Sequence, residues 1–139
     1  MKIAVTGATG GLGRSLTEFL IEQEVEVVAL GRNKRVGEQL QKLGAQFIAG
    51  EITDVNYLKS SFNGCDLVVH SAGLASPWGD WDLFYQANVI GTGSVLQAMR
   101  ELQINRLIYL STPSLYFSGK SFEQFRETDP LPEQNTNYG

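Results

Sequence analysis

The stretch VTGATGGLGR, residues Val5–Arg14, places glycines at positions 7, 10 and 13 between an apolar run and a helical pattern. Backbone N–H groups at a helix start can approach a pyrophosphate only where side chains do not obstruct them, and the last glycine lets the helix pack closely on the strand. The spacing alone is a weak signal, but its place between a strand and an amphipathic helix predicts a dinucleotide-binding turn. A purely structural turn is the alternative.

Short β-rich runs alternate with helical segments along the chain. We expect strands near residues 2–5, 25–30, 45–50, 65–73 and 105–111, and helices near residues 12–20, 34–44, 55–64 and 81–102. Such strands pair in parallel through right-handed crossovers, which place helices on both faces of the sheet. The sequence therefore predicts a doubly wound α/β domain of the Rossmann type over residues 1–139.

Local signals define the faces and ends of the expected helices. The first helix carries Leu12, Leu16, Phe19 and Leu20 on one face, and the fourth carries Val89, Leu96, Met99 and Gln103 near one stripe. Gly44 is expected to end the second helix, and Asp54 is expected to cap the third.

Composition and charge disfavour several classes of function. The net charge of −4 argues against a surface that follows phosphates of nucleic acid or binds anionic lipid. With one cysteine, Cys65, and one histidine, the chain can form neither an internal disulfide nor a structural zinc site. We see neither a leader pattern nor an apolar run of 18 residues. We therefore expect a cytoplasmic protein without a metal, nucleic-acid or membrane partner.

The end of the second expected strand reads LGRNKR, residues 30–35. In NAD-binding domains an acidic residue about 20 residues after the glycine turn binds the adenosine ribose, but here Gly31 occupies that place. Arg32 follows, and its guanidinium can bind a 2′-phosphate through two hydrogen bonds. This pattern predicts NADP, with NAD as the alternative. Lys34 and Arg35 fit a solvated helix start equally well.

Glu51 follows the third expected strand in the sequence AGEITD. Its carboxylate, with the adjacent backbone at Ile52, is a candidate to bind the amino group of adenine. A solvent-exposed side chain without a ligand is the alternative.

Five motifs, taken together, resemble one known family. They are TGATGGLG, GEITD, VVHSAG, NVIGT and RLIYLSTPSLYF, and they run in order over nearly the whole chain. The chain resembles the extended short-chain dehydrogenase/reductases, also called the NAD-dependent epimerase/dehydratase family. HSAGLASPWG and STPSLYF look most like the 3-beta-hydroxysteroid dehydrogenase-like branch. The resemblance implies hydride transfer between NADP(H) and a secondary alcohol or ketone.

The resemblance also implies where the cofactor binds. The implied cofactor-binding residues are Gly7, Thr9, Gly10, Gly11, Leu12, Gly13, Arg32, Glu51, Ile52, Ala72, Gly73, Leu74 and Asn88. Among them, Ala72, Gly73 and Leu74 would line the nicotinamide side. Asn88 would support the active-site backbone or the cofactor ribose, and an exposed helical asparagine is the alternative. For His70 a buried strand end is expected.

The implied catalytic residues are Thr112 and Tyr138. A hydroxyl at Thr112 would bind the substrate oxygen as negative charge develops, although a polar end of the strand is the alternative. Tyr138 would exchange the proton, aided by a lysine one helical turn later, beyond Gly139. Tyr116 and Lys120 have the same spacing as that pair, but the residues between them indicate a loop, so we reject them.

These signals leave three functions open. The first is an NADP-dependent oxidoreductase acting on a small molecule, and the second is a nucleotide-sugar epimerase or dehydratase. The third is a non-catalytic module that senses NADP. We expect the chain to be the cofactor-binding portion of a longer enzyme and to be inactive without the lysine beyond Gly139. The resemblance also implies that a homodimer can form through the fourth helix. Trp78 and Trp81 could border a substrate, although helix packing explains them equally.

Overall fold

The computed structural model describes residues 1–76, 78–116 and 126–131. Within these residues, five parallel strands form one sheet in the order β3-β2-β1-β4-β5. The strands are β1 (Lys2–Thr6), β2 (Glu26–Gly31), β3 (Gln46–Ala49), β4 (Leu67–His70) and β5 (Leu107–Tyr109). The chain reverses direction across the sheet between β1 and β4, so the expected doubly wound fold is confirmed.

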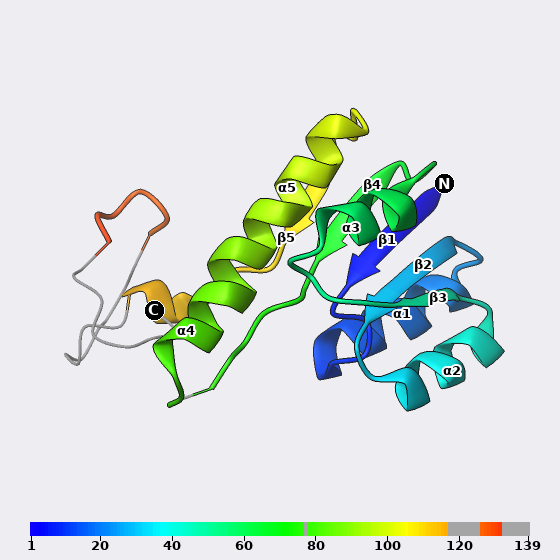
Figure 1. The fold of residues 1–139 in the computed structure, drawn as a ribbon, viewed down its shortest axis with the longest axis horizontal. Coiled ribbons are helices and arrows are strands. Elements are labelled where there is room, and N and C mark those ends of the chain that lie inside the picture. The colour runs from blue at the N-terminus through cyan, green and yellow to red at the C-terminus, as the bar shows by residue number, and fades with distance from the viewer. Residues whose placement is uncertain (77, 117–125, 132–139) are drawn as a thin grey trace.

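Helices cover both faces of the sheet (Figure 1). They are α1 (Gly11–Glu22), α2 (Lys34–Leu43), α3 (Val55–Phe62), α4 (Trp81–Phe84), the π-helical segment η1 (Tyr85–Ile90), α5 (Gly91–Glu101) and the 3₁₀ turn η2 (Pro113–Tyr116). The side chains of alternate strand residues point to opposite faces, so β1 contributes Ala4 to the layer under α3 and α5 and Val5 to the layer with α1 and α2.

The expected apolar face of α1 is partly wrong. Leu16 and Leu20 pack against the core, but Leu12 is 64% exposed. Phe19 is exposed as well. The buried residues of this helix are Gly13 and Thr17. Thr17 donates a hydrogen bond of 2.8 Å from Oγ1 to the carbonyl of Gly13. Small side chains allow close helix–sheet packing but give no hydrophobic signal in the sequence.

The expected long helix runs without a break over residues 81–101, but its turns are not uniform. Its middle turn, η1, is π-helical, and the buried face of α5 is formed by Gly91, Ser94, Val95, Ala98 and Met99. Met99 was expected on the stripe, but Val89 and Leu96 are exposed and Gln103 lies beyond the helix with a positive φ of 58°. Because small residues mark the face that packs against α3, the larger apolar residues indicated the wrong stripe.

The predicted helix ends are confirmed where they were specified. Asp54 accepts hydrogen bonds from the backbone N–H groups of Asn56 and Tyr57 at 2.9 and 3.0 Å, and therefore caps α3. Gly44 ends α2 in the left-handed conformation, with φ at 119°. At the start of the same helix, the side chain of Asn33 accepts a hydrogen bond from the N–H of Val36.

The expectation for His70 is also confirmed, because this last residue of β4 is fully buried. Its Nδ1 lies 2.7 Å from Oγ1 of Thr6 and its Nε2 lies 3.0 Å from Oγ1 of Thr92. The ring stacks on Tyr109 with centroids 5.4 Å apart. Burial disfavours the charged imidazolium and lowers the pKa of His70 from 6.5 to about 4.

This pKa predicts acid destabilisation. The unfolded chain takes up a proton on His70 below pH 6.5, whereas the folded protein does so only near pH 4. The free energy of unfolding should therefore be highest above pH 6.5 and should fall by about 2 kcal/mol between pH 7 and pH 5 from this group alone. Urea unfolding at a series of pH values measures how the free energy of unfolding depends on pH. His70→Gln should reduce this dependence between pH 7 and pH 5, and an equal dependence in both proteins would contradict the prediction.

Two helical glycines predict opposite effects of alanine. A Cβ at Gly37 in α2 would overlap the ring of Phe47, whereas a Cβ at Gly93 in α5 meets no atom within 4 Å. Gly37→Ala should lower the free energy of unfolding by about 1–3 kcal/mol despite its better helix propensity. Gly93→Ala should raise it by roughly 0.5–1 kcal/mol. Thermal and denaturant unfolding measure both variants. An equal change in the free energy of unfolding would show that packing against the Phe47 ring does not determine the effect of alanine at position 37.

Candidate functional site

A cleft of about 850 Å³ lies at the carboxyl ends of β1 to β4. In doubly wound folds this edge, where the strand order reverses, is the usual place for a ligand. Of the predicted cofactor-binding residues, Gly7, Thr9, Gly10, Arg32, Glu51, Ile52, Ala72, Gly73 and Leu74 line the cleft. The cleft is not lined by Gly11, Leu12, Gly13 or Asn88. Gly13 packs against Gly7, and Asn88 bonds to Leu74, so these two support residues that line the cleft.

The glycine turn packs its backbone directly against the chain that leaves β4. A Cβ at Gly7, whose φ is +70°, would lie 2.7 Å from the backbone nitrogen of Ala72. A Cβ at Gly13 would overlap the carbonyl oxygen of Gly7 and would lie 2.7 Å from Oγ of Ser71. These two positions therefore accept only glycine, unlike Gly11, where a Cβ would meet no atom within 4 Å.

The N-terminus of α1 opens at this turn. Its N-cap residue is Gly10, so no side chain accepts a hydrogen bond from the N–H groups of the first turn. These N–H groups, with the positive end of the helix dipole, suit an anionic group such as a pyrophosphate. The glycine turn thus leaves these N–H groups without a side-chain cap, and a Cβ at position 7 or 13 would clash with the turn itself or with the exit from β4.

The end of β2 has no room for a side chain at position 31. A Cβ on Gly31 would overlap Oγ1 of Thr9 and would lie 2.7 Å from its Cγ2 and 3.1 Å from its Cβ. Arg32 is the next residue, with its side chain 78% exposed and a guanidinium nitrogen 3.9 Å from a carboxylate oxygen of Glu51. This exposed pair contributes little to stability, so the guanidinium is free to bind a ligand phosphate instead.

Tyr57 is a residue of the cleft that the sequence analysis missed. Its ring lies where Gly50 has no side chain, and its hydroxyl donates a hydrogen bond of 2.8 Å to the carbonyl of Ile48. Burial, followed by the negative charge of Glu51, raises the pKa of Tyr57 to about 12. Its position on α3 faces the cleft only because Gly50 leaves space, so no spacing rule in the sequence would have identified it.

Asn88 holds the loop that follows β4. Its Oδ1 accepts a hydrogen bond from the N–H of Leu74 at 2.7 Å, and its Nδ2 donates one to the carbonyl of the same residue at 3.0 Å. The described contacts of this side chain are therefore to the backbone. Leu83, Gln86 and Ala87, from α4 and η1, line the cleft near this loop. The sequence pattern of that helix indicates packing and gives no sign that these residues line the cleft.

Thr112 follows β5 and does not line the cleft. Its Oγ1 accepts a hydrogen bond from the N–H of Ser114 and donates one to Oγ of the same residue, both at 3.1 Å. The N–H of Leu110 donates to the carbonyl of His70, so β5 ends beside β4 at the edge of the sheet that carries the cleft. Tyr138 and Lys120 lie outside the described residues, and Tyr116 ends the 3₁₀ turn η2.

Two further expectations concern aromatic residues and metals. Trp78 and Trp81 are both exposed, and the ring of Trp81 lies 6.1 Å from that of Tyr85. Over residues 1–76, 78–116 and 126–131, no group of three His, Cys, Asp or Glu side chains is placed to hold a metal ion. None of the helices described in those ranges combines the length and the apolar character needed to cross a membrane.

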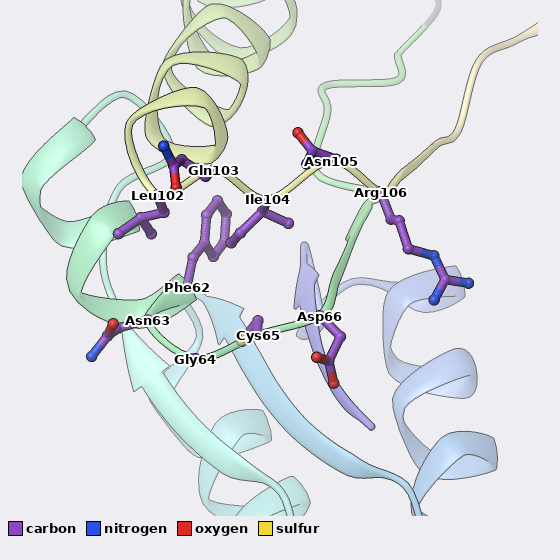
Figure 2. A pocket seen from close by; sticks show the side chains of 10 residues that line it. All are labelled: Phe62, Asn63, Gly64, Cys65, Asp66, Leu102, Gln103, Ile104, Asn105 and Arg106. Carbon is purple, nitrogen blue, oxygen red and sulfur yellow. The ribbon is translucent and has the colours of Figure 1, made fainter.

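A second hollow of about 370 Å³ lies at the opposite edge of the sheet, between the ends of α3 and α5 and the starts of β4 and β5. Figure 2 shows the ring of Phe62 beside Ile104, whereas Arg106 points away. Cys65, at this edge, is buried, and burial raises the pKa of its thiol, so the thiolate is disfavoured. This hollow lies at the amino ends of the strands, away from the glycine turn, so the cleft remains the candidate site.

Comparisons with known proteins agree with this geometry. The 2-alkyl-3-oxoalkanoate reductase of Shewanella oneidensis is 35% identical over 134 residues, which are 96% of this chain and 34% of the relative. The enzyme of the same name from Stenotrophomonas maltophilia is 41% identical over 115 residues, or 83% of this chain and 34% of the relative. The chain therefore spans about a third of the length of these two relatives.

Solved structures give the same result. The UDP-glucuronic acid 4-epimerase from Bacillus cereus, in complex with NAD, matches all of this chain and 48% of its own, with a TM-score of 0.85 and 28% identity. A family model described as the NAD dependent epimerase/dehydratase family matches residues 3–139. The five-stranded fold, the glycine turn and these similarities lead to one conclusion: the chain belongs to the NAD dependent epimerase/dehydratase family.

Proposed function

We propose that residues 1–139 form the cofactor-binding domain of an NADP-dependent oxidoreductase that interconverts a secondary alcohol and a ketone. The observation that carries this proposal is the glycine turn, in which Gly7 and Gly13 pack against the exit of β4 and leave the N-terminus of α1 open to an anion. The close packing alone would also suit a structural turn, but the uncapped N-terminus of α1 at a cleft lined by Gly7 and Gly10 favours an anionic ligand.

The residues of the cleft fit a dinucleotide. Gly7 and Gly10 with the start of α1 would hold the pyrophosphate, and Arg32 would bind the adenosine 2′-phosphate. Glu51 and the backbone of Ile52 would contact the adenine. Thr9, Gly11, Leu12 and Gly13 would complete the turn around the phosphates. Ala72, Gly73 and Leu74, with Asn88 behind them, would line the nicotinamide side, and the nicotinamide supplies or accepts the hydride when it is bound.

The preference for NADP over NAD rests on the end of β2. Position 31 has no carboxylate to bind the ribose hydroxyls or to repel a 2′-phosphate, and the packing of Thr9 leaves no space for one. Arg32 provides a cation at the same place, with its guanidinium largely in solvent. A 2′-phosphate would offer this guanidinium two hydrogen bonds, whereas a ribose hydroxyl offers no negative charge.

In the proposed reaction, the residues beyond β5 act on the substrate oxygen. Thr112 would donate a hydrogen bond to that oxygen after releasing its bond to Ser114, and Tyr138 would give or take the proton. The end of β5 lies beside the end of β4, and this neighbourhood supports the role proposed for Thr112. For ketone reduction, Thr112 stabilises the negative charge on the oxygen until Tyr138 protonates it.

The reductase relatives favour a ketone as the substrate. Two relatives at 35% and 41% identity are named 2-alkyl-3-oxoalkanoate reductases, whereas the matching 4-epimerase from Bacillus cereus is 28% identical. Ketone reduction is thus proposed ahead of nucleotide-sugar epimerisation, and a 3-beta-hydroxysteroid dehydrogenase-like branch agrees with it. An NADP-sensing module without catalysis is the remaining candidate.

Location and assembly are part of the same proposal. We place the protein in the cytoplasm, where NADP(H) is available. We propose a homodimer through the helix from α4 to α5, because Leu83, Val89, Ile90 and Leu96 are exposed along it. A dimer would remove this apolar surface from water.

Arg32 should determine the affinity for the 2′-phosphate. Arg32→Ala is expected to raise the Kd for NADPH about 10- to 100-fold, since a hydrogen bond to a charged group contributes about 1.5–3 kcal/mol. The Kd for NADH should change little, and titration calorimetry on the intact protein measures both. Arg35→Ala is the matched control, because Arg35 belongs to the same basic run but does not line the cleft. Unchanged NADPH affinity in Arg32→Ala, or a wild-type preference for NADH, would contradict the proposal.

Thr112 should affect turnover rather than cofactor binding. Thr112→Val is expected to lower kcat about 100- to 1000-fold by removing one hydrogen-bond donor to the developing oxyanion. Thr112→Ser should retain most of the activity, and the Kd for NADPH should stay unchanged in both variants.

The kcat of each Thr112 variant is measured from the oxidation of NADPH in the presence of 2-alkyl-3-oxoalkanoates. An assay for UDP-sugar epimerisation is run beside it. Equal kcat values for Thr112→Val and wild type would exclude the catalytic role. NADPH binding without turnover of any substrate class would favour the sensing module.

A further inference from the structure

We propose that His70 is a positioning residue that fixes the backbone of the Ala72–Leu74 loop through Thr6 and Thr92, as the tautomer protonated on Nε2. The inference rests on the proposed function, because it concerns the nicotinamide side of the cleft. His70 does not line the cleft and would not touch the cofactor. Its effect would pass through hydrogen bonds on both sides of its ring.

The tautomer follows from counting hydrogens. The hydroxyl of Thr92 donates its single hydrogen to the carbonyl of Asn88, at 2.7 Å. Oγ1 of Thr92 therefore accepts from Nε2 of His70, which lies 3.0 Å away. A neutral ring protonated on Nε2 has a bare Nδ1, so the hydroxyl of Thr6 donates to Nδ1 at 2.7 Å.

The same count leaves Thr6 free to accept one more hydrogen. The N–H of Ala72 donates to Oγ1 of Thr6 at 3.3 Å, which completes the chain. Every hydrogen in the series from Ala72 through Thr6, His70 and Thr92 to Asn88 then has one acceptor. In the other neutral tautomer Nδ1 of His70 would donate to Thr6, whose own hydroxyl hydrogen would then need another acceptor, and no hydrogen would lie between Nε2 and Thr92 while Thr92 donates to Asn88. Burial of the ring, which keeps the pKa of His70 near 4, supports a single proton at neutral pH.

This chain of hydrogen bonds connects the two anchors of the loop. At one end, Thr6 on β1 holds the N–H of Ala72, and at the other end the side chain of Asn88 holds both backbone groups of Leu74. Thr92 lies one helical turn after Asn88 and bonds to its carbonyl. The ring of His70, stacked on Tyr109, therefore connects the end of β4 to Thr92 in α5 and, through the carbonyl of Asn88, to the π-helical segment.

Thr92 allows a test that leaves the cleft lining untouched. Thr92→Val keeps the shape of the side chain but removes the hydroxyl, whereas Thr92→Ser keeps the hydroxyl. In the intact protein, Thr92→Val should raise the Kd for NADPH about 5-fold, the effect of one hydrogen bond of about 1 kcal/mol. The Kd for 2′,5′-ADP, which lacks the nicotinamide half, should stay unchanged. Thr92→Ser should restore NADPH affinity to within a factor of about two of wild type.

Ser61→Ala is the matched control for loss of a hydroxyl. The side chain of Ser61 is buried in α3 and donates at 2.8 Å to the carbonyl of Tyr57, four residues earlier, as Thr92 does to Asn88. It lies outside the proposed chain of hydrogen bonds. If the role of Thr92 were only structural, both substitutions would lower the Tm and neither would separate NADPH from 2′,5′-ADP.

The tautomer is measured directly by ¹⁵N NMR of the imidazole at neutral pH without any dinucleotide. We expect a protonated Nε2 and a bare Nδ1. A proton on Nδ1, or equal binding of NADPH by Thr92→Val and wild type, would overturn the inference while leaving the proposed function intact. A wild-type protein that binds no dinucleotide would overturn the proposed function, and with it the positioning role, whatever the tautomer.

Discussion

The contact between two stretches of backbone, the glycine turn after β1 and the exit of β4, is the constraint on which the rest of the site depends. A Cβ at Gly7 would lie within 2.9 Å of backbone atoms of Ser71 and Ala72, so the two stretches meet without an intervening side chain. This contact determines where α1 begins and where the loop to Leu74 runs. The cleft exists because both segments diverge from the sheet at this one point, where the strand order also reverses.

Packing and charge together determine which ligand groups the end of β2 can accept. Thr9 belongs to the glycine turn, but its side chain covers Gly31 at the end of β2 and excludes any larger residue there. The turn that provides N–H groups for a pyrophosphate therefore also determines which groups can face the adenosine ribose. Next to Gly31, Arg32 forms an exposed ion pair with Glu51 across 3.9 Å, which is weak enough for a bound anion to replace Glu51 as its partner.

The sequence predicted the strands and the glycine turn because both depend on local residue type and alternation, as in VVHSAG and VTGATGGLG. It did not predict the buried faces of α1 and α5 correctly. Thr17, Gly91, Ser94 and Ala98 mark those faces, and small or polar residues carry no hydrophobic signal although they allow the closest packing. Tyr57 was missed because its place in the cleft depends on the space left by Gly50 and on a hydrogen bond to the carbonyl of Ile48, neither of which has a spacing rule in the sequence.

The polar pair at the ends of β1 and β4 explains how irregular backbone can sit on an apolar core. Thr6 and His70 are partners in the sheet register and are both fully buried, in line with the apolar Ala4 and Val68 below them. Apolar side chains at these two positions would fill the same space, but they would remove the acceptor used by the N–H of Ala72 and the donor to Thr92. Burying polar atoms costs free energy unless they are bonded, and here each bond supports backbone that departs from regular strand or helix. Where the backbone hydrogen bonds of the sheet end, side-chain hydrogen bonds of Thr6 and His70 therefore hold the backbone that borders the cleft.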